Sequence, residues 1–491
     1  MSRIVKSFAA SLLAVALVLT GGTHALAASP DPALTSRIEA LMTDPAVTNA
    51  TVGAVVVDAD TGEEIYARNP DAMLVPASNM KMLTTAAALA TLGPDYQVPT
   101  KVLASKAPAR GVIGGNLYLK GFGDPTLTEA DLIGLAGQLR ASGVKKITGT
   151  LVADASFFDD SRYNAGWPAR IFEQSDAAQV AALTVTSNAD GAAGTTIVTA
   201  SGKRVGSRAT ITLSPAPASG YVTIVNKTTT GRAGTGTSIS VHRSASGTIT
   251  VSGRVAVRSS ASQLITVNSP ALYAAAIFRK ALAANGIKVV GKTTTGAAPA
   301  GAPVLQTHYS CAMSCVIYKL MKFSNNTQAE QVMKMVGATS GGQGTWASGA
   351  AVTKAVLAKA GIGAGELTIG DGSGQSYADR ITPRALMKLL LWVRGQSWYG
   401  AWYNALPVAG HPDKLVGGTI RDRFLGTPAA YNLRAKTGTL SDAFRVTALS
   451  GYVTGRDGRH YAFVGISNYS GASQRSVVDS MGVLLAGWTK P

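Results

Sequence analysis

A serine and a lysine three residues apart are the first pair in this sequence that could do covalent chemistry. Ser78 and Lys81 lie at the expected start of a helix, where residues three apart project from the same face. A serine hydroxyl is a weak nucleophile until a base removes its proton, and a lysine can be that base if burial and a neighbouring cation lower its pKa. The pair alone is weak evidence, because Ser-x-x-Lys occurs by chance in many long proteins.

A second string, Ser324-Asn325-Asn326, supplies hydroxyl and amide groups. Ser324 could pass the proton from the lysine to a leaving amine, and Asn326 could hold a peptide bond through its carbonyl and its amide. The same residue types also favour a helix N-cap, and a helix is expected from Gln328 to Val336. Capping and catalysis are compatible at this position.

A third string, Lys436-Thr437-Gly438-Thr439, lies on an expected strand. Its lysine could be the cation that the Ser–Lys pair needs, and its lysine and threonine hydroxyls could bind a substrate carboxylate. Its glycine would let a substrate lie against the strand edge, where an extended peptide can add by main-chain hydrogen bonds. The amide of Thr439 could pair with that of Ser78 as an oxyanion hole. The alternative is an ordinary glycine in a β segment.

The elements around these strings predict one split α/β domain. A valine-rich strand and a second strand flank Asp60-Thr61-Gly62 as a hairpin, and a helix runs from Ser78 to Gly93. Near the C-terminus we expect three strands and a closing helix: Leu433–Leu440, Arg445–Val453, His460–Asn468 and Ser476–Trp488.

Nearly half of the chain separates the first string from the second. Its first part alternates strand and helix patterns, with a helix from Glu129 to Ala141. From about Asp190 to Gln263 it is rich in Thr, Ser, Val and Gly in short alternating runs, which predicts a small β domain. A helix from Pro270 to Asn285 and a Gly/Ala/Pro linker from Gly296 to Pro303 follow.

Together with further motifs, the three strings resemble the D-alanyl-D-alanine carboxypeptidase/endopeptidase family, the low-molecular-mass class C penicillin-binding proteins of peptidase family S13. The further motifs are Gly115–Leu127, Asp371-Gly372-Ser373-Gly374, Thr382-Pro383-Arg384 and Arg434–Leu440. The resemblance implies a multi-domain α/β fold: a β-lactamase/transpeptidase-like domain with a central antiparallel sheet flanked by helices, split by two nested inserted domains, one α/β and one mainly β.

The resemblance also implies a function and a set of site residues. The function is cleavage of D-Ala-D-Ala ends and of D-Ala-to-diaminopimelate cross-links in peptidoglycan, with acylation by β-lactams and no metal or cofactor. The implied catalytic residues are Ser78, Lys81 and Ser324, and the implied substrate-binding residues are Asn326, Lys436, Thr437, Gly438 and Thr439.

The expected domain boundaries follow from the same resemblance and from the changes in composition. Residues 1–27 would be a signal peptide, and residues 28–97 and 301–491 the two parts of the transpeptidase-like domain. Residues 98–189 and 266–300 would form the first inserted domain, and residues 190–265 the small β domain.

Two departures from the family pattern concern the substrate side and the cysteines. The family commonly has Arg where this chain has Tyr377, although Arg380 is near, and Glu173 and Asp176 are candidates for an acid that reads a stem-peptide amine. The two cysteines, Cys311 and Cys315, replace a Ser/Pro-containing segment. Export would allow a disulfide, which is feasible if Cys311 precedes the helix, but free buried thiols are equally compatible with the spacing.

The N-terminus and the charge predict an exported, basic protein. Arg3 and Lys6 precede an apolar run, and Ala25-Leu26-Ala27 offers a cleavage pattern; the run is too short to favour a membrane anchor. The net charge of +18 predicts attraction to anionic cell-wall polymers or to a membrane surface. Nucleic acid is disfavoured, because we find no dense basic block with aromatics and no zinc-finger or helix-turn-helix pattern.

Three other functions compete with the peptidase. A class A β-lactamase would need a Glu-x-x-x-Asn pattern that is absent, and a class C enzyme would have Tyr in place of Ser324. A non-catalytic wall-binding or sensor protein would be expected to have lost a catalytic group, yet all are present. An exported adhesin explains the charge but not the motifs. The sequence therefore favours the peptidase.

Overall fold

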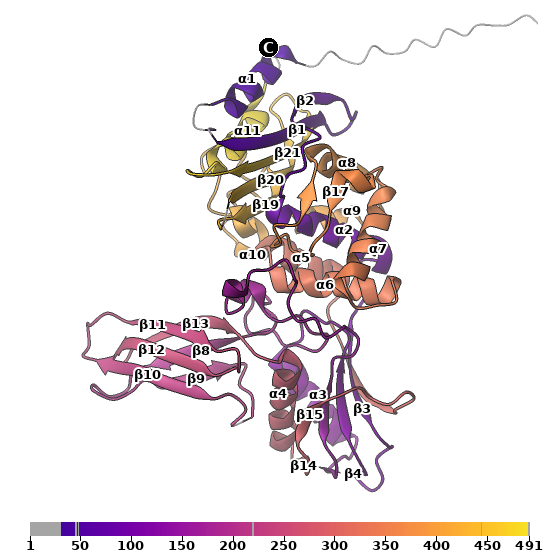
Figure 1. The fold of residues 1–491 in the computed structure, drawn as a ribbon, viewed down its shortest axis with the longest axis vertical. Helices are drawn as coiled ribbons and strands as arrows, with labels where there is room; N and C mark the ends of the chain where they lie inside the picture. The colour runs from indigo at the N-terminus through magenta and orange to yellow at the C-terminus, as the bar shows by residue number, and fades with distance from the viewer. Residues whose placement is uncertain (1–30, 45–46, 48, 219, 443, 490–491) are drawn as a thin grey trace, which may run out of the picture.

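The two ends of the chain meet in one antiparallel sheet (Figure 1). The computed structural model describes residues 31–44, 47, 49–218, 220–442 and 444–489, so the predicted signal peptide at residues 1–27 lies outside the described residues. In spatial order the sheet contains β19 (Arg434–Leu440), β20 (Arg445–Thr454), β21 (His460–Tyr469), β1 (Ala50–Asp58) and β2 (Glu64–Arg68). These bounds confirm the expected hairpin and the three expected C-terminal strands.

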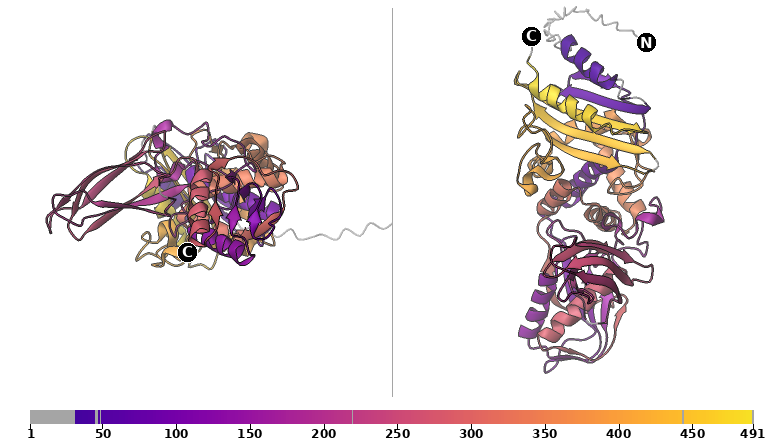
Figure 2. Two further views of the ribbon diagram at one scale, coloured as in Figure 1. Left: turned by 90° about the horizontal axis from the view of Figure 1, so that it is seen from below. Right: turned by 90° about the vertical axis from the view of Figure 1, so that its left-hand side faces the viewer.

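Helices surround this sheet (Figure 2). They are α1 (Pro32–Met42), α2 (Met80–Leu92), α5 (Met313–Phe323), α6 (Asn326–Ser340), α7 (Trp346–Ala358), α8 (Pro383–Arg394), α9 (Tyr399–Ala405), α10 (Lys414–Gly417) and α11 (Arg475–Gly487). A two-stranded ribbon, β17 (Leu367–Thr368) with β18 (Arg380–Ile381), lies among them.

Both faces of the sheet are covered, which explains the dense valine run in β1. Val52 and Val56 share a core with α1 and α11, whereas Val55 and Val57 share a core with α2, α5 and α8. Because side chains alternate across a strand, a strand that is buried on both faces needs apolar residues at every position. The composition of β1 therefore suits its place inside the sheet, between β2 and β21.

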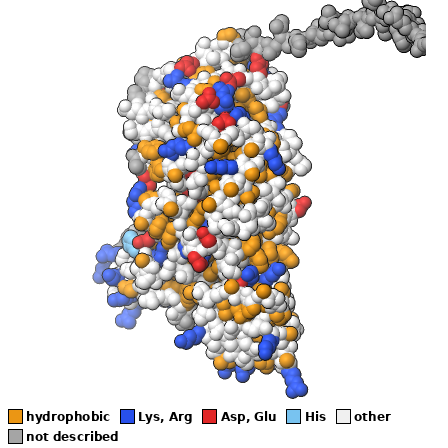
Figure 3. Space-filling view, turned by 45° about the vertical axis from the view of Figure 1, so that its right-hand side comes forward, with side chains coloured by type: hydrophobic (Ala, Val, Ile, Leu, Met, Phe, Trp, Pro, Cys, Tyr) orange, Lys and Arg blue, Asp and Glu red, His pale blue; other side chains and the backbone are white. Residues whose placement is uncertain are grey.

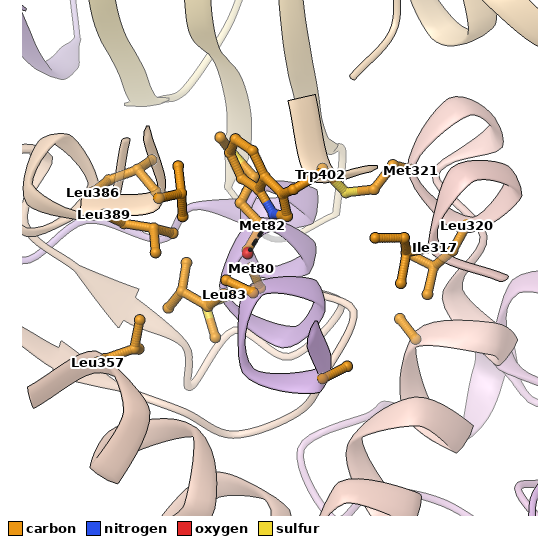
Figure 4. Packing of buried hydrophobic residues seen from close by; sticks show 14 of the residues in the cluster. Met80, Met82, Leu83, Ile317, Leu320, Met321, Leu357, Leu386, Leu389 and Trp402 are labelled. Carbon is orange, nitrogen blue, oxygen red and sulfur yellow. Dashed lines mark hydrogen bonds between the residues drawn. The ribbon is translucent and has the colours of Figure 1, made fainter. Parts of the chain in front are cut away.

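The core fixes α2, the helix that presents the Ser–Lys pair. Figure 4 shows α2 between side chains of α8 on one side and side chains of α5 on the other. The indole N–H of Trp402 on α9 donates a hydrogen bond to the carbonyl oxygen of Met82 (3.4 Å). A single 3₁₀ turn, Ala77–Asn79, precedes α2, so Ser78 lies in that turn and Lys81 in the first turn of the α-helix.

The segment between the first two strings builds a second sheet. In spatial order it contains β15 (Thr293–Thr295), β7 (Leu151–Asp154), β5 (Leu117–Gly121), β3 (Pro99–Ala104) and β16 (Val304–Tyr309). A smaller sheet of β14 (Lys288–Val289), β6 (Lys146–Ile147) and β4 (Val112–Ile113) lies beside it. The expected helices α3 (Glu129–Ala141) and α4 (Pro270–Ala284) pack on these strands in one core.

The strand β16 bears on one expected domain boundary. We expected residues from 301 onward to belong to the transpeptidase-like domain, but β16 pairs with β3 in the second sheet. The sequence could not reveal this pairing, because the backbone hydrogen bonds of a strand join it to a partner far away in the chain. We propose that the second part of the transpeptidase-like domain begins near Ser310, and we keep the other boundaries as proposals.

A β arm projects sideways from the molecule (Figure 1). It consists of two three-stranded sheets, β10 (Ile224–Gly231), β12 (Ile249–Ala256) and β11 (Ser238–Arg243), and β13 (Ser260–Thr266), β8 (Thr195–Ser201) and β9 (Thr210–Ser214). Its small core contains Val198, Val241, Val251 and Ile265. The short alternating runs in the sequence correspond to these strands, because only one face of each sheet is buried.

The two cysteines form a disulfide at the entry to α5. Cys311 lies before the helix and Cys315 lies in its first turn, with their Cα atoms 6.0 Å apart. The position of Cys311 outside the helix is the condition under which the sequence allowed a bridge. Among the described helices, none has the length and apolar character needed to cross a bilayer.

Candidate active site

The three strings meet in one open cleft between the sheet and the helices. Ser78 enters from the start of α2, Ser324 and Asn326 from the junction of α5 and α6, and the threonines of the third string from the edge strand β19. The cleft is lined by Ser78, Asp176, Phe323, Ser324, Asn326, Thr419, Arg423, Thr437, Thr439 and Arg475. Residues far apart in the sequence are therefore brought together as the motifs predicted.

Lys81 is held under the serine by three acceptors. Its Nζ donates hydrogen bonds to the Oγ of Ser78 (2.8 Å), the Oδ1 of Asn326 (2.7 Å) and the carbonyl oxygen of Ser373 (2.7 Å). Burial lowers the pKa of Lys81 to about 8, although nearby carboxylates, Asp371 foremost, act in the opposite direction. Burial, one of the two causes expected from the sequence, is thus the main cause of the shift.

Two buried carboxyl groups, one in the 371–376 loop and one on α6, hold the Ser373 carbonyl in place. Asp371 accepts backbone N–H groups of Ser373 (3.1 Å), Gly374 (2.6 Å) and Ser376 (2.7 Å). Glu330 on α6 accepts the N–H groups of Gly372 (3.0 Å) and Ser373 (2.8 Å). Burial and the charge of Asp371 raise the pKa of Glu330 to about 7. In the Asp-Gly-Ser-Gly motif the Asp371 carboxylate therefore holds the loop, and the Ser373 carbonyl oxygen supports the lysine.

Ser324 and Lys436 form a second pair on the opposite side of the cleft. Ser324 caps the C-terminus of α5 in a left-handed conformation with φ 54°, which turns the chain into α6. The Nζ of Lys436 donates a hydrogen bond to its Oγ (2.7 Å) and another to the carbonyl oxygen of Thr437 (2.8 Å). Burial and the charge of Lys81 hold the pKa of Lys436 well below its usual range. The N-cap of α6 is Asn325, so capping and the candidate site use adjacent residues.

Two glycines allow the close approach of three chain segments around Ser78. Gly374 has φ +82°, and a Cβ there would lie 1.8 Å from the carbonyl oxygen of Ala77. A Cβ at Gly438 would lie 2.6 Å from the carbonyl oxygen of Pro76. Any larger residue would push β19 or the 371–376 loop away from the serine, so both glycines are required by packing at the site.

The cleft also contains cations and a hydroxyl that the sequence analysis did not single out. Thr419 lies within hydrogen-bond distance of Thr437 (2.9 Å between the hydroxyl oxygens), and Arg423 and Arg475 line the same side. Arg423 forms an ion pair with Asp479. No local motif marks these residues, because they reach the cleft only through the packing of α11 and of the loop after α10.

The residues that the sequence suggested for binding the substrate side chain lie in different places. Asp176 lines the cleft, whereas Glu173 accepts the backbone N–H of Arg243 (3.2 Å) on the β arm. The hydroxyl of Tyr377, which stands where the family commonly has Arg, donates to the carbonyl oxygen of Phe444 (3.1 Å) and accepts the N–H of Asp442 (3.1 Å). Arg380 donates to the carbonyl oxygens of Tyr377 and Asp379 and so stabilises the loop.

Comparisons with known proteins found matches over most of this chain. The model of the D-Ala-D-Ala carboxypeptidase 3 (S13) family matches residues 34–487. A D-alanyl-D-alanine carboxypeptidase of an Actinomadura species is 38% identical over 490 residues, which cover 97% of this chain and 90% of the relative. The crystal structure of penicillin binding protein 4 (dacB) from Haemophilus influenzae matches with a TM-score of 0.75 and 25% identity, over 91% of this chain and 97% of that one.

Proposed function

Because this chain belongs to the D-Ala-D-Ala carboxypeptidase 3 (S13) family, it is a serine-type carboxypeptidase that acts on peptidoglycan, and we propose that Ser78 is the residue that its substrates and β-lactams acylate. The observation that supports this assignment best is the 2.8 Å hydrogen bond between the Lys81 Nζ and the Ser78 Oγ. It joins the nucleophile to a buried base at the floor of the cleft.

We propose that acylation begins with neutral Lys81 taking the proton of the Ser78 hydroxyl. The serine oxygen then attacks the carbonyl carbon of the penultimate D-Ala, and the amides of Ser78 and Thr439 stabilise the oxyanion. When the peptide bond breaks, Ser324 gives its proton to the leaving amine and recovers one from the lysine, which restores the neutral base. D-Ala leaves, and water later hydrolyses the acyl-enzyme.

Substrate binding would use the edge of β19 and the cations above it. Lys436, Thr437 and Thr439 are the proposed ligands of the terminal carboxylate, with Gly438 leaving room for the substrate against the strand. Asn326 would hold the preceding peptide bond. The positive charges of Arg423 and Arg475 in the same cleft favour an anionic substrate end.

We further propose that Asp176 binds an amine of the stem-peptide side chain and that the cleft accepts D-Ala-to-diaminopimelate cross-links as well as free ends. An acid in this position suits an amine-bearing stem peptide, and the cleft is open to solvent. Asp176→Asn should reduce kcat/KM for peptides with a free side-chain amine and leave acetylated peptides unaffected. Glu173→Gln, a change three residues away that faces Arg243 of the β arm, is the matched control and should leave both substrates unaffected.

One experiment tests the assignment of Ser78 and separates the competing functions. The protein is incubated with a fluorescent penicillin beside Ser78→Ala and Ser246→Ala, an exposed serine on the β arm. We expect the parent protein and Ser246→Ala to form a stable covalent adduct and to release D-Ala from a pentapeptide. Ser78→Ala should do neither. An adduct that persists in Ser78→Ala refutes the assignment. Rapid turnover of the penicillin would favour a β-lactamase, and no adduct at all would favour a non-catalytic wall-binding or sensor protein.

We also propose that the chain is exported by the signal peptide at residues 1–27 and works outside the cytoplasm. Arg3, Lys6 and the Ala25-Leu26-Ala27 pattern support cleavage before Ala28. The net charge of +18 supports attachment to anionic cell-wall polymers or to a membrane surface. N-terminal sequencing of the protein secreted by an expressing bacterium tests the cleavage; a first residue at Met1 would contradict it.

A further inference from the structure

The positive charge of this protein is distributed unevenly. Between Asp190 and Glu330 the sequence has no Asp or Glu, and this stretch includes the whole β arm. In the space-filling view, blue side chains stand out on the arm at the lower left (Figure 3). The arm therefore has an excess of cations that no carboxylate of its own can balance.

Three turns at the free end of the arm bring the cations together. The turn after β12 is joined to the turn after β8 by the N–H of Arg258 and the carbonyl oxygen of Gly202 (2.8 Å). It is joined to the end of β10 by the N–H of Val257 and the carbonyl oxygen of Gly231 (3.0 Å). We call the exposed cations of this end the basic tip: Lys203, Arg204, Arg208, Arg232, Arg254 and Arg258.

No residue of the basic tip forms an ion pair within the described part of the chain. Like charges held together by a hydrogen-bonded scaffold repel one another, and an external polyanion relieves that repulsion while releasing its own counterions. From this arrangement we propose that the basic tip binds a cell-wall polymer with a phosphodiester in each repeat, and so anchors the enzyme near its substrate. The identity of this partner rests on the proposed extracytoplasmic function.

The side chains around the basic tip favour a polymer over a membrane or a nucleic acid. Tyr221 is the only aromatic residue in the arm sequence between residues 195 and 266, and its ring packs against Tyr273 of α4 (5.8 Å between centroids). The tip thus offers no aromatic platform for stacking bases. Val205 is the one large apolar residue exposed among these turns, whereas surface-bound membrane proteins insert several.

The test compares two variants of the whole mature protein that lose equal charge. Arg204→Gln, Arg232→Gln and Arg258→Gln together remove one cation from each turn of the tip. Lys145→Gln, Lys146→Gln and Lys288→Gln together remove three exposed lysines from the small sheet of β14 and β6 and serve as the matched control. Binding is measured with polyphosphate over a range of salt concentrations, with cell walls before and after chemical removal of phosphodiester polymers, and with vesicles containing phosphatidylglycerol.

We expect the tip variant to bind polyphosphate at least about 10-fold more weakly at 0.1 M salt, with the slope of log K against log salt shallower by roughly three units. The control should change little, and only walls that retain the polymers should bind the parent protein strongly. The proposal is overturned if both variants lose the same affinity for polyphosphate, or if the parent protein binds stripped walls as strongly as intact ones. It is also overturned if the tip binds vesicles more tightly than polyphosphate. Release of D-Ala from a soluble pentapeptide should be the same in all forms, which separates this test from that of the active site.

Discussion

The Nζ of Lys81 and the carbonyl oxygen of Ser373 are joined by a 2.7 Å hydrogen bond between residues 292 positions apart. A neutral lysine has two N–H donors and one lone pair, whereas three acceptors surround this one. If the two donors face Ser373 and Asn326, the lone pair faces the hydroxyl of Ser78. The loop that carries Ser373 then accepts a hydrogen bond from Lys81 and also directs the lone pair of its Nζ towards Ser78.

The first prediction concerns the base itself. Since Lys81 must be neutral and its pKa is lowered to about 8, the rate of acylation by penicillin should rise with pH and level off above about 8. Lys81→Ala should lower the rate by roughly 10²–10⁴-fold, as removal of a general base does. Stopped-flow acylation and circular dichroism check both points; a folded variant that still acylates at a substantial rate would refute the role.

The second prediction concerns the loop behind the lysine. Glu330→Gln places an amide donor against the N–H groups of Gly372 and Ser373, so at least one hydrogen bond is lost and the Ser373 carbonyl is freed. The maximal acylation rate should fall by about 10- to 100-fold, in line with the loss of about 1–3 kcal/mol for a buried unmatched group. The inflection of the pH profile should move to lower pH, because the charge of Glu330 raises the pKa of Lys81.

Asp379→Asn is the control for the Glu330 variant. Burial and the charge of Asp371 raise the pKa of Asp379 well above its usual range. Its Oδ1 accepts the N–H of Gly370 (2.7 Å), and an amide oxygen can accept the same hydrogen bond. The maximal acylation rate should be unchanged, because the hydrogen bonds from Gly372 and Ser373 to Glu330 remain. If both variants were equally impaired, the effect would reflect general damage to the buried carboxyl cluster instead of support for Lys81.

The third prediction uses two glycines with the same backbone conformation. Gly374 (φ +82°) and Gly458 (φ +84°) both favour glycine, so alanine should cost each about 1–2 kcal/mol of stability. Only Gly374→Ala also collides with the carbonyl oxygen of Ala77, since nothing lies within 4 Å of a Cβ at Gly458. Penicillin labelling should be lost in Gly374→Ala and retained in Gly458→Ala; retention in both would show that the loop can move without displacing Ser78.

The fourth prediction is a minimum of stability near neutral pH. Burial raises the pKa of Glu330 from 4.5 to about 7 and that of Asp124 from 3.8 to about 6, so the folded state binds more protons than the unfolded one in these windows. The free energy of unfolding should therefore fall as the pH rises from about 4 to 7. Burial lowers the pKa of Lys81 from 10.5 to about 8 and that of Lys322 from 10.5 to about 7, so stability should rise again towards pH 10.

Denaturant melts at intervals of pH check the stability curve. Lys322→Met removes one buried titrating group and should flatten the rise between about pH 7 and 10.5. The substitution also removes the Lys322 hydrogen bonds to the carbonyl oxygens of Leu406 and Val416, of which the Val416 oxygen still accepts the N–H of Val408, so its overall stability should be lower. A curve with its maximum at pH 7 would contradict the direction of these shifts.

Local patterns in the sequence predicted most of the secondary structure and made the catalytic motifs recognisable. The valine run of β1, the hairpin at Asp60-Thr61-Gly62 and the helix α3 were predicted close to their observed bounds, because side-chain period and turn residues act over a few positions. The three strings were recognisable because each requires particular residue types side by side. The family and its activity followed from their combination.

Only the tertiary structure decided which distant groups meet. The pairing of β16 with β3, the support of Lys81 by Glu330 and the loop at Ser373, and the entry of Arg423 and Arg475 into the cleft have no local signal. Each depends on how separate segments pack, and hydrogen bonds and burial act between neighbours in space whatever their distance along the chain. The sequence by itself thus determined the chemistry that is available, and the packing decided which buried charges and carbonyl oxygens surround Ser78.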